Sequence, residues 1–390
     1  MLALTAERLL APTHEILNPV VLIEDGRIVE VASSLSRAIP SQARHLDLPG
    51  AVLAPGFVDI HIHGGSGFDV MGEGTDCLSI IETMLARHGV TSYFPTTVTA
   101  PLEDTLRALE RLAVAVEKGK FSEKSIGKPL RARPCGIHLE GPFLSHARRG
   151  VHPPEDLQLP TLALFERFWQ ASRGQIRVMT IAPELPGAEE VIAEAVRRGV
   201  CVSLGHSDAD FDATERGITA GARHATHTFN AMRALGHRDP GILGAVLTDA
   251  RVTADIIADG IHLDPAIVRL FLKMKGVERS VLITDATAAT GMPNGRYKLG
   301  PFEVEVKDGR CMIGDALAGS VLTMDQAIRN VMEFAGWSLS DAVRLATFNP
   351  AKAAGIEQQA GQLVPGAWAD MVVLSSSGEV RQTMVRGSLV

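Results

Sequence analysis

The chain has 390 residues, of which 46% are hydrophobic and 21% are charged, and its formal net charge is −7 at pH 7. This composition excludes a disordered or fibrous protein, and a chain of this length can bury a barrel of about 250 residues beside a smaller domain. A pI near 6.0 gives no sign of the basic surface that a nucleic-acid binder needs, so we expect a small-molecule partner and no nucleic acid.

The cysteines and the N-terminus indicate the compartment. Cys77, Cys135, Cys201 and Cys311 are far apart and form no CxxC pair, which argues against a disulfide framework and against a thiolate zinc site. The first eight residues lack the pattern of an export signal, and no window approaches the roughly 18 apolar residues of a membrane span. We therefore expect a cytoplasmic protein that has no membrane segment.

Both ends of the chain are predicted to be β-structure. Residues 20–29 contain two apolar segments around Asp25-Gly26, a strong hairpin signal. Strand-like runs return near the C-terminus, at Met371–Leu374 and around Val385. We predict that residues 1–54 and 356–390 combine into one small β-sandwich domain.

Residues 55–355 alternate between short apolar or β-branched runs and helix-like segments, which is typical of parallel βαβ units. Eight such repeats predict a (β/α)8 barrel of the TIM type, with an open doubly wound sheet as the alternative. The expected strands are Gly56–Ile62, Val90–Thr97, Cys135–Glu140, Ile176–Ala182, Val200–Gly205, His224–Phe229, Val252–Ile257 and Ser280–Thr284.

Helical spacing fills several of the intervening segments, namely Cys77–His88, Leu102–Lys118, Ala188–Arg198 and Pro265–Met274. The eighth unit is interrupted. Turn signals at Asn294-Gly295 and Asp308-Gly309 predict a hairpin inserted at about residues 293–314.

Reactive side chains occupy the predicted strand ends. His61 and His63 alternate along the first strand and therefore point the same way, where both could bind one divalent metal. Active sites of such barrels lie at the C-terminal ends of the strands, and four more strand ends carry Glu140, His206, His227 and Asp285. Nitrogen and oxygen ligands of this kind suit zinc, iron or manganese, as one ion or two.

The motif set resembles the amidohydrolase superfamily and, within it, the family of N-acetylglucosamine-6-phosphate deacetylases. The resemblance spans nearly the whole chain. It rests on segments that recur in order, namely Pro55–Gly64, His138–Phe143, Leu204–Ser207, His224–Met232 and Thr284–Ala286.

This resemblance implies a metal-dependent hydrolysis of the acetamide of N-acetyl-D-glucosamine 6-phosphate. Glu140, His206 and His227 would hold the principal metal, and His61 and His63 allow a second ion that Glu140 would bridge. A bound metal lowers the pKa of its water towards neutrality. The ion is expected to be zinc, with iron or manganese as alternatives.

The resemblance also assigns the remaining roles. Asp285 would be the catalytic acid and base, and His152 would stabilise the oxyanion. Arg238 would bind the phosphate from the neighbouring subunit, which implies a homodimer. Contacts to the sugar are implied for His152, the Asn230 and Ala231 backbone, His262, Leu317, Ala318, Gly319 and Ser320.

Other interpretations remain open. The same machinery could deacetylate another N-acyl amino sugar, such as N-acetylgalactosamine 6-phosphate, because epimers differ in one hydroxyl. A cyclic amidase is disfavoured because the fourth strand ends Ala182-Pro183-Glu184, without the lysine that bridges two metals in that class. A non-catalytic paralogue is disfavoured because every expected ligand is present. His138 and His224 are expected to support the site or pack, and His237 receives no role.

Overall fold

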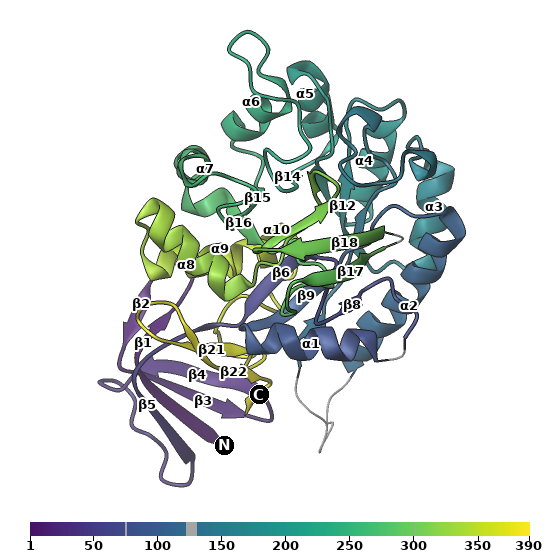
Figure 1. Ribbon diagram of the computed structural model, residues 1–390. Helices are drawn as coiled ribbons and strands as arrows, with labels where there is room; N and C mark the ends of the chain where they lie inside the picture. The colour runs from purple at the N-terminus through teal and green to yellow at the C-terminus, as the bar shows by residue number, and fades with distance from the viewer. Residues whose placement is uncertain (75, 122–130, 301) are drawn as a thin grey trace.

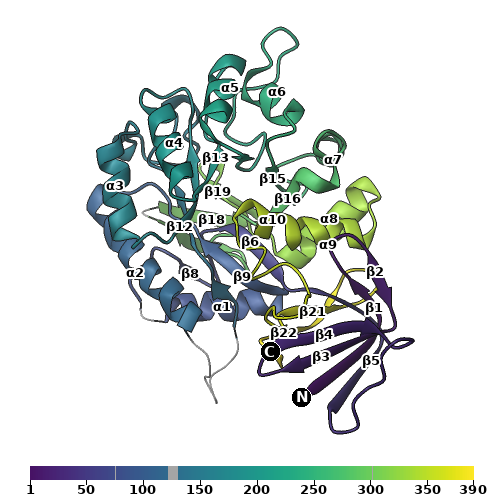
Figure 2. The same ribbon diagram turned by 180° about the vertical axis from the view of Figure 1, so that it is seen from behind.

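The structure is a computed structural model that describes residues 1–74, 76–121, 131–300 and 302–390. A barrel lies beside a smaller sheet, and the N- and C-termini both lie in that smaller sheet (Figures 1 and 2). None of the described helices is both long enough and apolar enough to cross a membrane.

The described residues form a barrel of parallel strands. Its strands are β6 (Phe57–Ile62), β9 (Val90–Pro95), β11 (Ile137–Glu140), β12 (Ile176–Ile181), β13 (Cys201–Leu204), β14 (His224–Ala225), β15 (Ala254–Ile257) and β16 (Ser280–Ile283). β6 pairs with β9, β11 to β14 pair in sequence, and β15 pairs with β16. Bridges between Ile62 and Ala286 and between Thr96 and His138 connect these sheets, and Thr228 donates its N–H to the Asp255 carbonyl. The predicted closed (β/α)8 barrel is confirmed.

Helices surround the strands and bury an apolar face against them. α4 is an example, because its Val191, Ile192 and Ala195 are buried while Glu189 and Glu190 are exposed. The helix bounds are α1 (Cys77–Arg87), α2 (Leu102–Phe121), α3 (Leu162–Ala171), α4 (Ala188–Arg197), α5 (Phe211–Ala220), α6 (Gly241–Thr248), α7 (Pro265–Arg279), α8 (Met324–Ala335), α9 (Leu339–Leu345) and α10 (Phe348–Ala353). Asp210 begins α5 by accepting the Ala213 N–H, a cap that stabilises a helix by about 1 kcal/mol.

The two ends of the chain combine in one small β domain, as the sequence predicted, and their strands pair in one sheet. Its strands are β1 (Leu2–Leu10), β2 (Glu15–Leu17), β3 (Pro19–Glu24), β4 (Arg27–Ser33), β5 (Arg44–Pro55), β21 (Met371–Leu374), β22 (Val380–Val385) and β23 (Ser388–Leu389). β5 pairs with both β1 and β21, and the sheet has its own apolar core. Asp25 and Gly26 form the β3–β4 turn with φ of 48° and 77°, as a tight hairpin requires. The exact domain boundaries stay predictions.

The predicted inserted hairpin is longer than expected. It is an antiparallel sheet of β17 (Gly295–Leu299), β18 (Phe302–Lys307), β19 (Arg310–Ile313) and β20 (Ala316–Leu317), and residue 301 lies outside the described residues. Asp308-Gly309 forms the expected turn, whereas Gly295 begins a strand instead of turning. Short strands β7 (Gly64–Gly65) and β8 (Phe68–Asp69) lie under the insert, and Asp69 accepts the Gly300 N–H at 2.6 Å. Beside β9 lies β10 (Arg133–Pro134).

The predicted strand His224–Phe229 is too long. β14 ends at Ala225, because His227 and Phe229 have φ of 31° and 80°. A left-handed residue cannot continue a strand, so the chain turns away from the barrel wall at this point.

Candidate metal centre

Three of the predicted site residues share one backbone conformation. His206, His227 and Asp285 follow the ends of β13, β14 and β16 and have φ of 48°, 31° and 51°. Left-handed residues other than glycine cost about 1–3 kcal/mol and cluster at functional sites. The conformation ends each strand where the side chain enters the barrel mouth.

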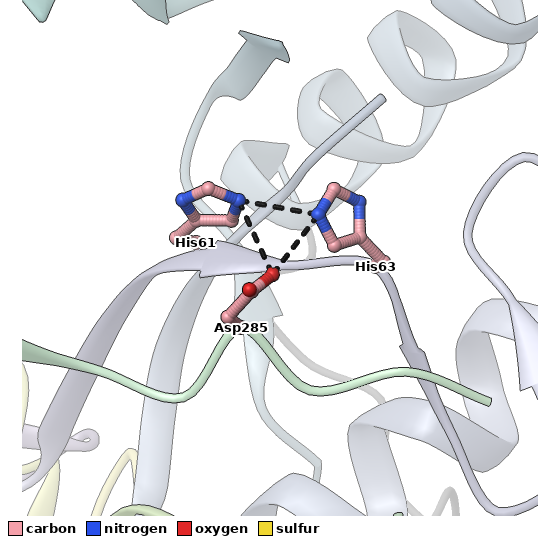
Figure 3. Close-up of side chains that lie close together, drawn as sticks. All are labelled: His61, His63 and Asp285. Carbon is pink, nitrogen blue, oxygen red and sulfur yellow. Dashed lines mark hydrogen bonds and ion pairs between the residues drawn. The ribbon is translucent and has the colours of Figure 1, made fainter. Parts of the chain in front are cut away.

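The first group of side chains comprises His61, His63 and Asp285 (Figure 3). The two Nε2 atoms are 3.2 Å apart, and Asp285 Oδ1 lies 3.2 Å from His63 Nε2 and 3.5 Å from His61 Nε2. His63 donates its Nδ1–H to the Thr96 carbonyl at 3.0 Å, so the Nε2 lone pair of the neutral ring faces Asp285.

A second group lies next to the first. Glu140 Oε1 is 3.3 Å from His206 Nε2 and 3.2 Å from His227 Nε2, and these two nitrogens are 3.0 Å apart. His206 donates its Nδ1–H to the Arg148 carbonyl, which again leaves Nε2 for the site. The other Glu140 oxygen, Oε2, lies 3.3 Å from His63 Nε2. Glu140 therefore faces one histidine pair with each of its oxygens.

The electrostatics of the two groups fit a bound cation. Burial lowers the pKa of His63, but hydrogen bonds to Asp285 and Glu140 outweigh burial and raise it to about 10. The pKa of His227 is raised to about 9, again against burial, by Glu140. Imidazole nitrogens that lie 3.2–3.5 Å from the oxygens of two carboxylates form a ligand set for a divalent metal, which can replace the protons that these pKa values retain.

His152 differs from the other histidines. Its Nδ1 accepts the Thr99 N–H at 3.2 Å, so the neutral ring carries its proton on Nε2, which points towards Glu140 Oε2 at 3.8 Å. Burial and the nearby His206 lower the pKa of His152 to about 3. His152, Glu140 and His206 also form a group whose ligand atoms lie within 4.8 Å of one another. His227 Nε2 lies closer to Glu140, at 3.2 Å, than His152 Nε2 does, at 3.8 Å, so His227 is the better third ligand.

Sequence reasoning missed two buried carboxylates behind the ligands. Asp59 accepts the Thr284 hydroxyl at 2.5 Å and the His61 N–H at 3.3 Å. Asp255 contacts both His224 and the backbone of His227. The available signal was a single carboxylate within a short, fully buried strand, which rarely occurs without a specific partner.

The histidines without an assigned role divide into buried and exposed. His138 bonds to the Ile60 carbonyl and Thr180, and its ring centroid is 4.6 Å from that of His61. His224 is also buried, whereas His237 is exposed. The expected supporting positions of His138 and His224 agree with these contacts.

The predicted substrate residues are only partly brought together. Ser320 donates its N–H to the Asp285 carbonyl and its hydroxyl to the Thr284 carbonyl, so the end of the insert contacts the site. Leu317, Ala318 and Gly319 precede it in the chain. Asn230 donates to the His227 carbonyl, and the Ala231 carbonyl accepts the N–H of Ser207, the residue after His206.

Two other predicted residues lie outside both metal-ligand groups. His262 follows β15 and its Nδ1 is 2.7 Å from Asp259 Oδ2. Arg238 is exposed in the loop before α6, and the described residues give it no hydrogen bond or ion pair. An exposed guanidinium of this kind is open to a partner from outside the chain.

Known proteins resemble the chain over almost its whole length. N-acetylgalactosamine-6-phosphate deacetylase of Escherichia coli O157:H7 is 37% identical, covering 97% of this chain and 99% of the relative. N-acetylglucosamine-6-phosphate deacetylase of Bos taurus is 39% identical, covering 94% and 90%. The structure of N-acetyl-D-glucosamine-6-phosphate deacetylase from Mycobacterium smegmatis, with N-acetyl-D-glucosamine-6-phosphate, superposes with a TM-score of 0.91 at 39% identity, covering 100% and 98%.

The family assignment follows from a match that covers both the barrel and the C-terminal strands of the small sheet. Residues 52–390 match the amidohydrolase family. The strand-end ligands, the closed barrel and this match agree, and the chain belongs to the amidohydrolase family.

Proposed function

We propose that this protein hydrolyses the acetamide of N-acetyl-D-glucosamine 6-phosphate to D-glucosamine 6-phosphate and acetate. The observation that carries the proposal is that a neutral histidine donor, an ionised aspartate and a carboxylate–histidine ligand set meet in one cluster of buried side chains. Relatives at 35–39% identity that bear this activity in their names support the substrate.

Glu140, His206 and His227 would hold the principal divalent metal. His61 and His63 would hold a second, with Glu140 between the two sites, because its two oxygens face different histidine pairs. When bound, a divalent ion supplies Lewis-acid polarisation of the amide carbonyl and acidification of water. We propose zinc as the ion, since nitrogen and carboxylate ligands suit it, with iron and manganese as alternatives.

Asp285 is the proposed acid and base. Burial raises the pKa of Asp285, but His61 and His63 outweigh burial and lower it to about 2, so the carboxylate is ionised at neutral pH. It takes a proton from the attacking water and returns that proton to the departing amine, which cannot leave unprotonated. His152 donates Nε2–H to the carbonyl oxygen as negative charge develops there.

Arg238 is the proposed phosphate ligand. It is exposed and unpaired among the described residues, and its planar guanidinium suits a phosphate. We propose that it reaches the site of a second copy of this chain in a homodimer. The cytoplasmic location inferred from the cysteines, which are all free, stays a prediction.

The galactosamine epimer is the second candidate substrate, because the E. coli O157:H7 relative bears that name at 37% identity. The decisive experiment measures acetate release from N-acetylglucosamine 6-phosphate, unphosphorylated N-acetylglucosamine and N-acetylgalactosamine 6-phosphate, with enzyme of measured metal content. Turnover of the first substrate alone would establish the proposal. Preference for the third would move the substrate to the epimer, and failure on all three with metal bound would refute both.

A further inference from the structure

Asp255 of β15 is a buried carboxylate in the barrel wall that contacts two residues of the neighbouring segment. It is 1% exposed. Oδ2 lies 2.9 Å from His224 Nε2, and Oδ1 accepts the backbone N–H of His227. The Asp255 carbonyl also accepts the Thr228 N–H at 2.9 Å. Asp255 therefore accepts two successive backbone N–H groups, those of His227 and Thr228.

These contacts connect the segment after β14 to β15, where the two strands form no ladder of backbone hydrogen bonds. β14 ends at Ala225, and left-handed residues follow at His227, Phe229 and Ala231. Such a backbone persists only where surrounding contacts determine it. The same turn carries the proposed metal ligand His227 and the proposed sugar contacts Asn230 and Ala231.

The rings of His227 and His61 lack the anchor that the other two histidine ligands have. Metal-binding histidines usually fix their orientation through the second ring nitrogen. His63 and His206 do so through the Thr96 and Arg148 carbonyls. The buried Nδ1 of His227 has no hydrogen-bond partner among the described residues. Its orientation must therefore come from its backbone, which Asp255 holds.

His224 fixes the carboxylate in turn. The Thr253 hydroxyl donates to the Arg223 carbonyl at 3.0 Å, so it can only accept from His224 Nδ1, which lies 2.7 Å away. The imidazole is thus held at Nδ1, and its Nε2 lies 2.9 Å from Asp255 Oδ2. This chain of contacts leaves the carboxylate one orientation.

We propose that Asp255 is a positioning residue, whose carboxylate holds the His227 backbone so that His227 Nε2 faces Glu140 and His206. This inference rests on the proposed metal-dependent function. Under this proposal, metal affinity depends on a hydrogen-bond acceptor at position 255. The position of the Asn230–Ala231 turn against the substrate depends on the same acceptor.

The test measures Zn²⁺ dissociation constants of the purified full-length protein by competition with a chromophoric chelator. Asp255→Ala should weaken Zn²⁺ binding about 10–100-fold, the usual effect of losing a residue behind a metal ligand, and should raise KM for N-acetylglucosamine 6-phosphate. Asp255→Asn should stay within about threefold of wild type, because its amide oxygen still accepts the His227 N–H while its NH2 group faces His224.

Asp325→Ala is the matched control. Asp325 is also a buried carboxylate on a histidine, 3.0 Å from His88 Nδ1, but its partners lie outside the site: His88 follows the end of α1, and Arg329 belongs to α8. This variant should lose stability and keep the wild-type Zn²⁺ affinity. If Asp255→Ala does not fold, Asp255→Ser takes its place, since a serine hydroxyl is too short to reach the same partners.

Two results would overturn this inference without affecting the proposed function. The first is a Zn²⁺ affinity of Asp255→Ala within about twofold of wild type. The second is a Zn²⁺ affinity of Asp255→Asn as low as that of Asp255→Ala, which would assign the effect to charge. A wild-type protein that binds no Zn²⁺, Fe²⁺ or Mn²⁺ would overturn the proposed function as well. Weak binding by the alanine variant together with recovery in the asparagine variant would establish the role.

Discussion

Thr99 contacts Nδ1 of His152 through its hydroxyl at 2.8 Å and its backbone N–H at 3.2 Å, and the N–H, which can only donate, determines which nitrogen of the histidine can act. With Nδ1 occupied as an acceptor, the neutral ring must carry its proton on Nε2. Burial and His206 lower the pKa of His152 to about 3, so this form persists across the neutral pH range.

Replacing His152 by Ala should lower kcat about 100-fold or more, the usual effect of losing one oxyanion donor. His152→Gln should recover part of that loss, because its amide can also donate. His146→Ala is the control, since His146 is exposed in the same loop. The acetate-release rate should keep one pH profile from about pH 5 to 8 in wild type and His152→Gln, because a group with a pKa near 3 does not titrate there. A loss of equal size in both His152 variants would contradict the donor role.

Asp285→Asn should reduce kcat about 1,000-fold, within the range for loss of a general acid and base, while substrate affinity changes little. The amide has nearly the shape of the carboxylate but cannot accept the proton. Calorimetric binding and acetate release on the same preparation separate the two effects. Asp308→Asn is the control, because Asp308 is an exposed turn residue with a φ of 52°, close to the 51° of Asp285. Retained turnover would remove Asp285 from the mechanism.

The bridging position of Glu140 predicts the metal content. Wild type should bind about two ions per chain and lose activity on chelation, because each Glu140 oxygen faces a separate histidine pair. His63→Asn should bind about one ion, and Glu140→Gln should weaken both sites. Elemental analysis of dialysed protein checks this prediction. A single ion in wild type would leave His61 and His63 with a different role.

Arg238→Ala should raise KM for the phosphorylated substrate at least about tenfold and leave the unphosphorylated substrate unaffected. Arg381→Ala, an exposed arginine of the terminal sheet, is the control. In a homodimer that shares its sites, mixing Arg238→Ala with Asp285→Asn and allowing exchange should restore activity in roughly a quarter of the sites. No recovery after exchange, with mixed dimers demonstrated, would place Arg238 in the site of its own chain or remove it from the site.

Glu82 should make stability depend on pH. Its side chain is 16% exposed and accepts the Tyr93 hydroxyl, and burial outweighs Arg131 and Tyr93 to raise the pKa of Glu82 to about 7. The folded state therefore holds a proton between about pH 4.5 and 7 that the unfolded state releases, so stability falls as pH rises through this window.

Denaturant unfolding of wild type and Glu82→Gln at pH 5 and pH 8 measures the effect. Wild type should lose up to about 3 kcal/mol more than the glutamine variant between these two values. Glu303→Gln should match wild type, because Glu303 is 67% exposed in a surface ion pair. Identical pH dependence in wild type and Glu82→Gln would show that burial does not perturb this carboxyl.

The barrel could be predicted because its signals are local. Short apolar runs alternate with helical segments, and strand polarity places the residues after β6, β11, β13 and β16 at one end of the barrel. The alternation of His61 and His63 needs only the two-residue period of a strand. The Asp25-Gly26 turn is likewise a property of two adjacent residues.

Other features depend on contacts between distant parts of the chain, and only the tertiary structure decided them. His227 is held by Asp255, 28 residues away, and His152 receives its tautomer from Thr99, 53 residues away. The division of the Glu140 oxygens between two histidine pairs depends on four strands that meet in the barrel, β6, β11, β13 and β14. Local sequence patterns determine where a strand runs and which way it faces, whereas barrel closure determines which atoms come within hydrogen-bond distance, because that distance depends on the register of every neighbouring strand.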